Sequence, residues 1–226
     1  MKLRLAIFDV DGTLIDSQNA ILAGMSAAFE AERLTAPDRG AVLSIVGLSL
    51  PEAMARLAPE ADAAAQARLV EGYRTAIISA RHMGRAEAAA PLYDGIRDVL
   101  DHLRGRDAML LGAATGKARR GFDHMTDAHG LAGYFQTIQT ADLHPSKPHP
   151  SMIHAALSDT GIDADCAVMI GDTTFDIEMG RAAGVRTLGV AWGYHAVDAL
   201  RQAGADAIVD DPRALVASVD EILGTH

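Results

Sequence analysis

Two aspartates stand close together near the beginning of the chain, in the segment Phe8-Asp-Val-Asp-Gly12. They follow a short apolar run, residues 3–8, whose composition predicts a buried strand that ends in a glycine turn. Because alternate side chains of an extended strand point the same way, Asp9 and Asp11 can face one ligand. Two carboxylates this close repel each other unless one is protonated or a cation lies between them. Taken alone, such a pair is more often an acidic surface turn, so its meaning depends on the rest of the chain.

A second acidic pair follows another apolar run. Residues 166–170 predict a buried strand, Asp172 comes after its end, and Asp176 lies one turn into the next predicted helix. Asp176 can be read as no more than an acid near a helix N-terminus, worth about 0.3–1 kcal/mol. Alternatively, the carboxyl ends of parallel strands meet at one edge of a sheet, and the two pairs together place four carboxylates there. Such a cluster is costly without a cation. Oxygen ligands alone select a hard ion, so we predict Mg²⁺.

Two further segments offer groups that bind an anion. Thr115 and Gly116 follow a predicted strand and open a helix, so they present a hydroxyl and backbone N–H groups. Lys147 lies in Ser146-Lys-Pro-His-Pro150, where two prolines restrict the loop and therefore the lysine. The whole chain has only three lysines: Lys2, Lys117 and Lys147. Each feature has an ordinary structural explanation, but together they predict a site for a metal and a phosphoryl group.

The elements that must position these residues are apolar strands that alternate with helices. This pattern predicts an α/β, Rossmann-like parallel sheet with helices on both faces. The strands are expected at residues 3–8, 108–114, 134–139, 166–170, 185–190 and 207–209. The helices are expected at 94–104, then ending near 128, 159 and 183, then near 195–203 and at the end of the chain.

Residues 17–90 have a different pattern, rich in alanine, leucine and arginine and without a convincing strand. We interpret them as an inserted bundle of about four helices. The expected domains are an α/β catalytic core, residues 1–16 and 91–226, and an all-helical cap, residues 17–90. Hinges are expected near Asp16–Ser17 and Ala90–Pro91, where cap movement would control access to the site and exclude water.

Four segments, in this order, resemble the motifs of the haloacid dehalogenase superfamily of phosphohydrolases: FDVDGTLIDS, AATGK, SKPHP and GDTTFDIEMG. The resemblance extends over essentially the whole chain, and the helical insert is similar to the subgroup with a helical cap. Within that subgroup the chain resembles the phosphoglycolate phosphatases, and the segment GRAAGVRTLGVAWGYH adds to this likeness. The resemblance implies a Mg²⁺-dependent phosphatase that acts on a small phosphorylated metabolite.

The resemblance also implies a role for each motif residue. Asp9 would take the phosphoryl group as an aspartyl-phosphate, and Asp11 would protonate the leaving oxygen and then activate water. Thr115 and the N–H of Gly116 would hold phosphoryl oxygens, while Lys147 would offset negative charge. The expected metal ligands are Asp9, the backbone carbonyl of Asp11, and Asp172, with Asp176 supporting that site or Lys147.

The second motif departs from the family pattern at one position. Family members often have asparagine after the threonine, where this chain has Gly116. We expect the backbone contact to the phosphoryl group to remain and a side-chain contact to be lost, which alters how the substrate is oriented.

Particular residues disfavour other chemistries of the superfamily. Dehalogenases lack the second aspartate of the first motif, which is present here as Asp11. Phosphonatases use a cap lysine, and residues 16–90 contain none. Phosphoglucomutases typically carry a cap histidine soon after the first motif, whereas His82 is the only cap histidine and lies late in the insert. The alternatives left open are phosphatases for a sugar phosphate, a nucleoside monophosphate or pyrophosphate, and, less favoured, a β-phosphoglucomutase-type enzyme or a non-catalytic binding protein.

The leaving group is expected to meet residues of the cap. The loop 47–52 is expected to reach the substrate, and its small, mostly apolar residues favour a compact substrate over a polymer. All basic cap residues other than histidine are arginines, and one of them can pair with a substrate carboxylate such as that of glycolate. These arginines are Arg33, Arg39, Arg56, Arg68, Arg74, Arg81 and Arg85. Residues 192–195 follow a strand end and either border the pocket or serve packing.

Composition limits the remaining possibilities. Of the 226 residues, 49% are hydrophobic and 22% charged, which is typical of a globular protein and excludes a disordered chain. The formal net charge of −10 disfavours binding to a nucleic-acid backbone. Cys166 is the only cysteine, so no disulfide can form within the chain. No uncharged apolar stretch approaches about 18 residues, so we expect a cytoplasmic protein that does not enter membranes.

Overall fold

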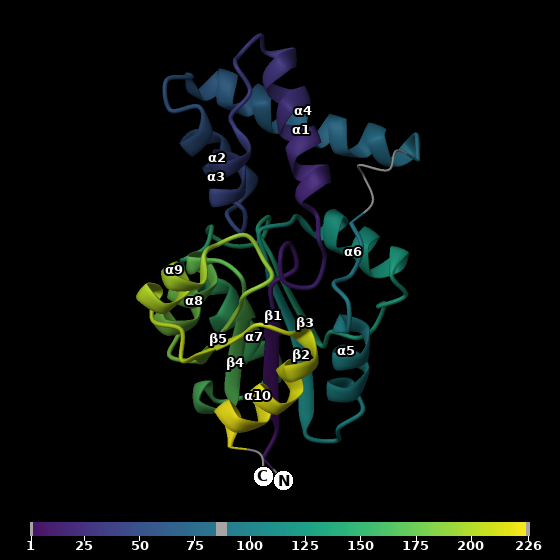
Figure 1. Cartoon of the computed structure of the whole chain (residues 1–226), viewed down its shortest axis with the longest axis vertical. Helices are drawn as coiled ribbons and strands as arrows, with labels where there is room; N and C mark the ends of the chain where they lie inside the picture. The colour runs from purple at the N-terminus through teal and green to yellow at the C-terminus, as the bar shows by residue number, and fades with distance from the viewer. Residues whose placement is uncertain (1, 85–89, 225–226) are drawn as a thin grey trace.

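The computed structural model describes residues 2–84 and 90–224 and shows a sheet-based core beneath a group of helices (Figure 1). The sheet has six strands, all parallel, in the order β3-β2-β1-β4-β5-β6. This arrangement confirms the predicted Rossmann-like α/β core. The strands are β1 Arg4–Phe8, β2 Met109–Thr115, β3 Thr137–Thr140, β4 Ala167–Gly171, β5 Arg186–Val190 and β6 Ala207–Val209.

The period of two along β1 explains why both faces of the sheet are covered. Ala6 and Phe8 point to one side, into an apolar cluster with α5, α6 and α10, whereas Leu5 and Ile7 point into a second cluster with α7 and α8. Helix α9 lies beside α8. These helices are α5 Ile96–Arg104, α6 Arg119–Ala128, α7 Ser151–Thr160, α8 Thr174–Ala182, α9 Val197–Ala203 and α10 Leu215–Leu223, with 3₁₀ turns at Ala164–Cys166 and Pro212–Ala214.

The predicted strand at 134–139 begins later than expected. Tyr134 and Phe135 are buried in the apolar cluster on the α5 side, and Phe135 meets the ring of Phe122 edge-on. Gln136 makes two hydrogen bonds with Leu111 on β2. Its backbone N–H donates to the carbonyl of Leu111, and its side-chain oxygen accepts from the N–H of Leu111. Tyr134 and Phe135 are therefore held by packing before the strand begins, and the pairing of β3 with β2 starts only at Thr137.

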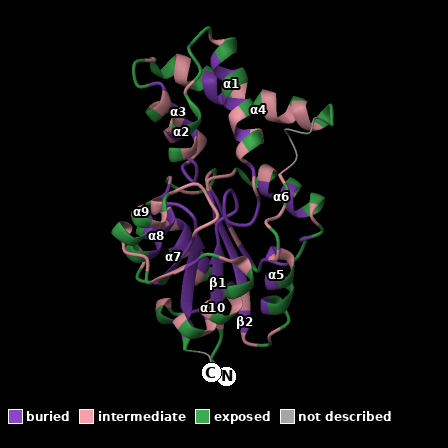
Figure 2. Cartoon of the chain, in the orientation of Figure 1, coloured by how far each residue is buried: buried purple, intermediate pink, exposed green. Residues whose placement is uncertain are grey.

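The helical insert after β1 has an apolar core of its own. Met25 and Phe29 on α1, Met54 on α3, and Leu69 on α4 are buried together, apart from the sheet (Figure 2). The four helices lie at the end of the molecule away from the chain termini (Figure 1). The predicted helical insert is therefore present, and we call it the cap. Its helices are α1 Gln18–Ala31, α2 Arg39–Ser44, α3 Leu50–Leu57 and α4 Ala63–His82.

The two segments that join core and cap run side by side. The N–H of Asp16 donates to the carbonyl of Pro91 at 2.8 Å, and the N–H of Tyr93 donates to that of Leu14 at 3.0 Å. The hinges expected at Asp16–Ser17 and Ala90–Pro91 fall on this pair of segments. The domain boundaries stay a prediction, since residues 85–89 lie outside the described residues.

None of the helices in the described parts of the chain is both long enough and apolar enough to cross a membrane.

Candidate active site

The carboxyl end of the central strand β1 carries Asp9, which is completely buried. Its N–H donates to the carbonyl of Ile170 at the end of β4, so the backbone stays in register with the neighbouring strand up to this residue. Gly12 follows in a left-handed conformation with φ of 87° and turns the chain away from the sheet.

Asp172 reaches the same point from the end of β4. A Cβ atom on Gly12 would lie 2.2 Å from its Oδ2, so a side chain at that position would displace the carboxylate. The hydroxyl of Thr13 donates to Oδ1 at 2.9 Å, and the N–H of Tyr194 donates to Oδ2 at 2.8 Å. These contacts fix both oxygens of Asp172 beside Asp9.

Asp176 is held by the first turn of α8. Its Oδ2 accepts hydrogen bonds from the N–H and the hydroxyl of Thr173, at 3.0 Å and 2.7 Å, as part of a capping box. Its Oδ1 accepts one from Lys147 Nζ at 2.6 Å, and the same ammonium lies 2.8 Å from Asp9 Oδ1. Lys147, which is 1% exposed, therefore bridges two buried carboxylates from different motifs. The resemblance implied that Lys147 offsets negative charge at Asp9, and that role stays a prediction.

Asp9, Asp172 and Asp176 form a buried acidic cluster. One carboxylate oxygen from each lies within 4.8 Å of the others, as the ligands of one metal ion must. Lys147 is the only cation in ion-pair contact with the cluster among the described residues, which leaves excess negative charge. Asp9 Oδ2 is buried without a hydrogen-bond partner in the same part of the chain. An all-oxygen, net negative set with an unused ligand atom fits a hard divalent cation.

The ionisation of the cluster reflects burial and crowding. Burial raises the pKa of Asp9 to about 7; the charge of Lys147 opposes the rise and that of Asp176 adds to it. The pKa of Asp172 is raised by burial and by the charges of Asp176 and Asp9. Burial alone would lower the pKa of Lys147, but Asp176 and Asp9 outweigh it and the pKa is raised. A cation bound here would favour the ionised forms of Asp9 and Asp172.

Asp11 lies outside this cluster, next to the start of the cap. Lys117 Nζ is 2.7 Å from its Oδ1, and the hydroxyl of Ser17 donates to the same oxygen. Ser17 is tied to the core through Tyr194, whose hydroxyl accepts from the Ser17 N–H at 2.9 Å. Tyr194 belongs to residues 192–195, for which the sequence left open a place beside the pocket or in packing. Lys117 and Ser17 end two of the family-like segments, but the sequence assigned no role at this site to either.

Thr115 ends β2, the strand on the other side of β1 from β4. Its side chain is buried, and its hydroxyl accepts a hydrogen bond from the N–H of Lys117 at 3.2 Å. Gly116 follows it at the carboxyl edge of the sheet. All seven residues expected at the site therefore belong to loops or helix starts at the carboxyl ends of β1, β2 and β4 or to the Pro-rich loop before α7: Asp9, Asp11, Thr115, Gly116, Lys147, Asp172 and Asp176.

The cap closes over this edge of the sheet. The N–H of Ser49 donates to Ser146 Oγ at 2.8 Å, and Phe175 at the start of α8 packs against the apolar core of the cap. Residues 192–195 serve both expected purposes, because Trp192 packs on the core cluster while Tyr194 contacts Asp172 and Ser17.

Most cap arginines have structural partners. Arg39 bonds to Gln18, Arg56 to Glu52, Arg68 to Glu32, and Arg74 lies near Glu71. Arg81, near the end of α4, is partly buried and makes no ion pair or hydrogen bond within the described residues. Burial lowers the pKa of Arg81, Tyr73 and the negative charge of Asp11 oppose this, and Arg120 adds to the lowering. The charge of Asp11, on the core, therefore acts on Arg81, on the cap. Arg85 lies outside the described residues.

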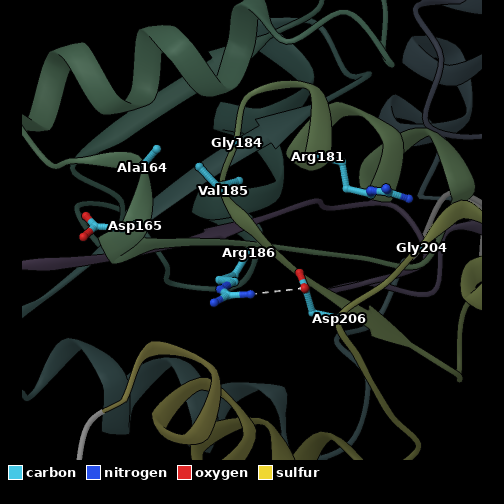
Figure 3. A pocket seen from close by; sticks show the side chains of 8 residues that line it. All are labelled: Ala164, Asp165, Arg181, Gly184, Val185, Arg186, Gly204 and Asp206. Atoms are coloured by element: carbon cyan, nitrogen blue, oxygen red, sulfur yellow. Dashed lines mark hydrogen bonds and ion pairs between the residues drawn. The ribbon is translucent and has the colours of Figure 1, made fainter.

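A separate hollow of about 460 Å³ opens at the opposite edge of the sheet, beside the starts of β4 and β5. Figure 3 shows Arg186 and Asp206 paired across it, at 3.5 Å, and Arg181 pointing along the wall. The Arg181 guanidinium donates to the carbonyl of Ala203. Asp165, which also lines the hollow, pairs with Lys2. Each charged group of the hollow therefore has a partner, and the buried acidic cluster remains the candidate for chemistry.

Comparison with known proteins agrees with this geometry. The sequence model of the haloacid dehalogenase-like hydrolases matches residues 6–190, which is most of the chain and includes all four motifs. The chain belongs to this family. The expected class of enzyme, a haloacid dehalogenase-like phosphatase, is thereby confirmed.

The relatives include phosphatases with different substrates. A probable phosphatase, IndB, of Dickeya dadantii is 33% identical over 97% of this chain and 94% of its own. An N-acetylmuramic acid 6-phosphate phosphatase of Pseudomonas aeruginosa is 32% identical over 99% of this chain and 97% of its own. A phosphoglycolate phosphatase of Rhodospirillum rubrum is 30% identical over 98% and 91%. Membership of this hydrolase family is therefore clear, and the choice of substrate must be argued from the site.

Proposed function

We propose that the protein is a Mg²⁺-dependent phosphatase that hydrolyses a small phosphomonoester, with phosphoglycolate as the first candidate. The observation that carries this is the arrangement around Asp9: a buried carboxylate at the end of the central strand, 2.8 Å from Lys147 and within 4.8 Å of two further carboxylates. A binding protein for an anion does not need three buried acids beside its lysine, because they repel the ligand.

In the first step the Asp9 carboxylate attacks phosphorus and the ester oxygen leaves, which forms an aspartyl-phosphate. The Thr115 hydroxyl and the N–H of Gly116 hold phosphoryl oxygens, and Lys147 offsets the charge that they share with Asp9. Asp11 donates a proton to the leaving oxygen. It then accepts one from the water that attacks the aspartyl-phosphate and releases inorganic phosphate.

The metal site of this proposal consists of Asp9, Asp172 and the backbone carbonyl of Asp11, with Asp176 in support. Bound there, Mg²⁺ supplies positive charge that draws the phosphoryl group to an acidic site. Asp176 has a second task, because its bond to Lys147 keeps that ammonium between the motifs. A cytoplasmic location also stays a prediction.

Arg81 supports a leaving group that carries a carboxylate. Its guanidinium is partly buried and in the field of Asp11, where the proton for the leaving oxygen is held. An arginine without a partner at such a place binds an anionic group of the ligand well. Glycolate has a carboxylate, and so does N-acetylmuramic acid, whose 6-phosphate is the substrate named for the Pseudomonas aeruginosa relative. That sugar acid phosphate is accordingly the second candidate.

The test is phosphate release from a panel of phosphoglycolate, N-acetylmuramic acid 6-phosphate, glucose 6-phosphate, a nucleoside monophosphate and pyrophosphate. Each is measured with Mg²⁺ and with a chelator, for the wild type and for Asp9→Asn. Hydrolysis that is highest for phosphoglycolate, requires Mg²⁺ and disappears in Asp9→Asn supports the proposal. Activity that survives both chelation and Asp9→Asn overturns it.

A further inference from the structure

The cap meets the phosphate-binding turn backbone to backbone. The segment Ile45–Ser49, here called the cap loop, presents two carbonyl oxygens to Gly116. A Cβ atom on Gly116 would lie 2.6 Å from the carbonyl oxygen of Leu48 and 2.7 Å from that of Gly47. Both atoms belong to the backbone, so no rotation of a side chain can relieve the contact. Any residue other than glycine at 116 requires the cap loop to move outward.

The cap loop cannot move far without loss of other contacts. Leu48 is buried in the apolar core of the cap, and the N–H of Ser49 is bound to Ser146 Oγ. Gly47 has φ of 97°, and a Cβ there would lie 3.1 Å from Thr173 Oγ1. The loop is therefore seated on three segments of the core at once: the turn after β2, the Pro-rich loop, and the start of α8.

We propose that Gly116 is a specificity-determining residue, because its lack of a side chain lets the cap loop close directly onto the turn that follows Thr115. The closed cap loop reduces the space above the phosphoryl site, so a compact leaving group fits and a bulky one is excluded. This deepens the proposed function and rests on it.

Two substrates of different size test the idea, phosphoglycolate and N-acetylmuramic acid 6-phosphate. The variants are Gly116→Ala and Gly116→Asn, and Ser146→Ala loosens the same loop from the other side. Gly121→Ala is the matched control, because a Cβ at Gly121 meets only Lys117 carbons at 3.9 Å, an ordinary contact distance. Hydrogen–deuterium exchange of the Leu48 and Ser49 amides reports the seating of the loop without any need for catalysis.

We expect Gly116→Ala and Gly116→Asn to reduce kcat/KM for phosphoglycolate by about tenfold or more and to reduce it much less for the bulky ester, so that the ratio falls about tenfold. The two amides should exchange faster in both variants and in Ser146→Ala, while Gly121→Ala matches the wild type. Equal losses on both substrates, or an unchanged ratio, overturn the proposal. Unchanged exchange of the two amides also overturns it. If the wild type hydrolyses no phosphomonoester of the panel, the proposed function fails, and the exchange comparison still decides whether Gly116 seats the loop.

Discussion

The backbone N–H of Ser49, in the cap, donates a 2.8 Å hydrogen bond to Oγ of Ser146, the residue before Lys147. The position of the cap is thereby linked to the loop that carries the lysine of the candidate site. If the cap opens about the hinges predicted at Asp16–Ser17 and Ala90–Pro91, this bond must break. Lys147 stays with the core, because its ammonium is bound to Asp9 and Asp176.

Ser146→Ala tests that link. A hydrogen bond of this kind contributes about 1 kcal/mol net, so amide exchange at Ser49 should rise by about fivefold. Global stability should change little, since the contact joins two bodies that each have an apolar core. Ser79→Ala, at an exposed position of α4, is the control and should leave the exchange unaltered. Equal exchange at Ser49 in the wild type and Ser146→Ala would show that the bond does not hold the cap.

Removal of Asp172 should abolish stabilisation by Mg²⁺. A metal that binds only the folded protein raises its stability by about 2.7 kcal/mol at a hundredfold excess over Kd. We therefore expect Mg²⁺ to raise the Tm of the wild type and not that of Asp172→Asn, as followed by differential scanning calorimetry. Asp198→Asn removes an exposed carboxylate of α9 and should keep the full shift. The same Mg²⁺-induced rise in Asp172→Asn and the wild type would place the metal elsewhere.

Arg81→Gln should discriminate between leaving groups. Loss of a hydrogen bond to a charged group costs about 1.5–3 kcal/mol, so kcat/KM for phosphoglycolate should fall by about 10–100-fold. An ester whose leaving group has no carboxylate, p-nitrophenyl phosphate, should be hydrolysed by Arg81→Gln at nearly the wild-type rate. Arg74→Gln alters an exposed arginine of the same helix and should affect neither substrate. Parallel losses on both esters in Arg81→Gln would mean that Arg81 does not recognise the carboxylate.

His195 should make stability depend on pH. Burial lowers its pKa, and the negative charges of Asp176 and Glu178 and the backbone of Ser44 only partly oppose this. Near pH 6.5, the ordinary pKa of histidine, the unfolded chain then binds more protons than the folded one, so stability rises with pH. The contribution is fully present above about pH 6.5 and is lost as the pH falls through that value towards the folded-state pKa.

Urea unfolding between pH 8 and pH 5 measures this slope. His195→Phe keeps a ring beside Phe175, whose centroid lies 5.5 Å from that of His195. The stability of the wild type relative to His195→Phe should rise between pH 5 and about pH 6.5, whatever slope the buried carboxyls Asp9 and Asp172 add to both proteins. His154→Gln, at an exposed position of α7, should keep the wild-type slope. An equal slope in wild type and His195→Phe would assign the pH dependence to other groups.

The core could be predicted from the sequence because its strands are short apolar runs that end in polar turns. The parallel sheet then brings Asp9, Thr115 and Asp172 to one edge, whatever the details of the helices. The restricted conformation of the loop that carries Lys147 could also be predicted, since it contains two prolines. The start of β3 was harder to predict, because Tyr134 and Phe135 favour a strand by composition but pack in the apolar cluster before the strand begins.

Contacts between cap and core were beyond the sequence. The pairing of Lys117 with Asp11, the field of Asp11 at Arg81 and the contact between Gly47 and Gly116 all depend on how the cap is placed on the sheet. Helical periodicity identifies the apolar face of each cap helix, but it does not specify that placement. The resemblance therefore drew attention to Gly116 without showing that the cap loop lies against it.

The central claim, that Asp9 carries the phosphoryl group, is tested most directly by trapping the acyl phosphate. Borohydride reduces an aspartyl-phosphate to homoserine, which peptide mass spectrometry can locate in the chain. In Asp11→Asn, in which breakdown of the aspartyl-phosphate is slowed, incubation with p-nitrophenyl phosphate and Mg²⁺ before reduction should place homoserine at position 9, because the p-nitrophenolate leaves without a proton from residue 11. Asp9→Asn should give none. Homoserine at another aspartate, or full phosphatase activity in Asp9→Asn, would contradict the account.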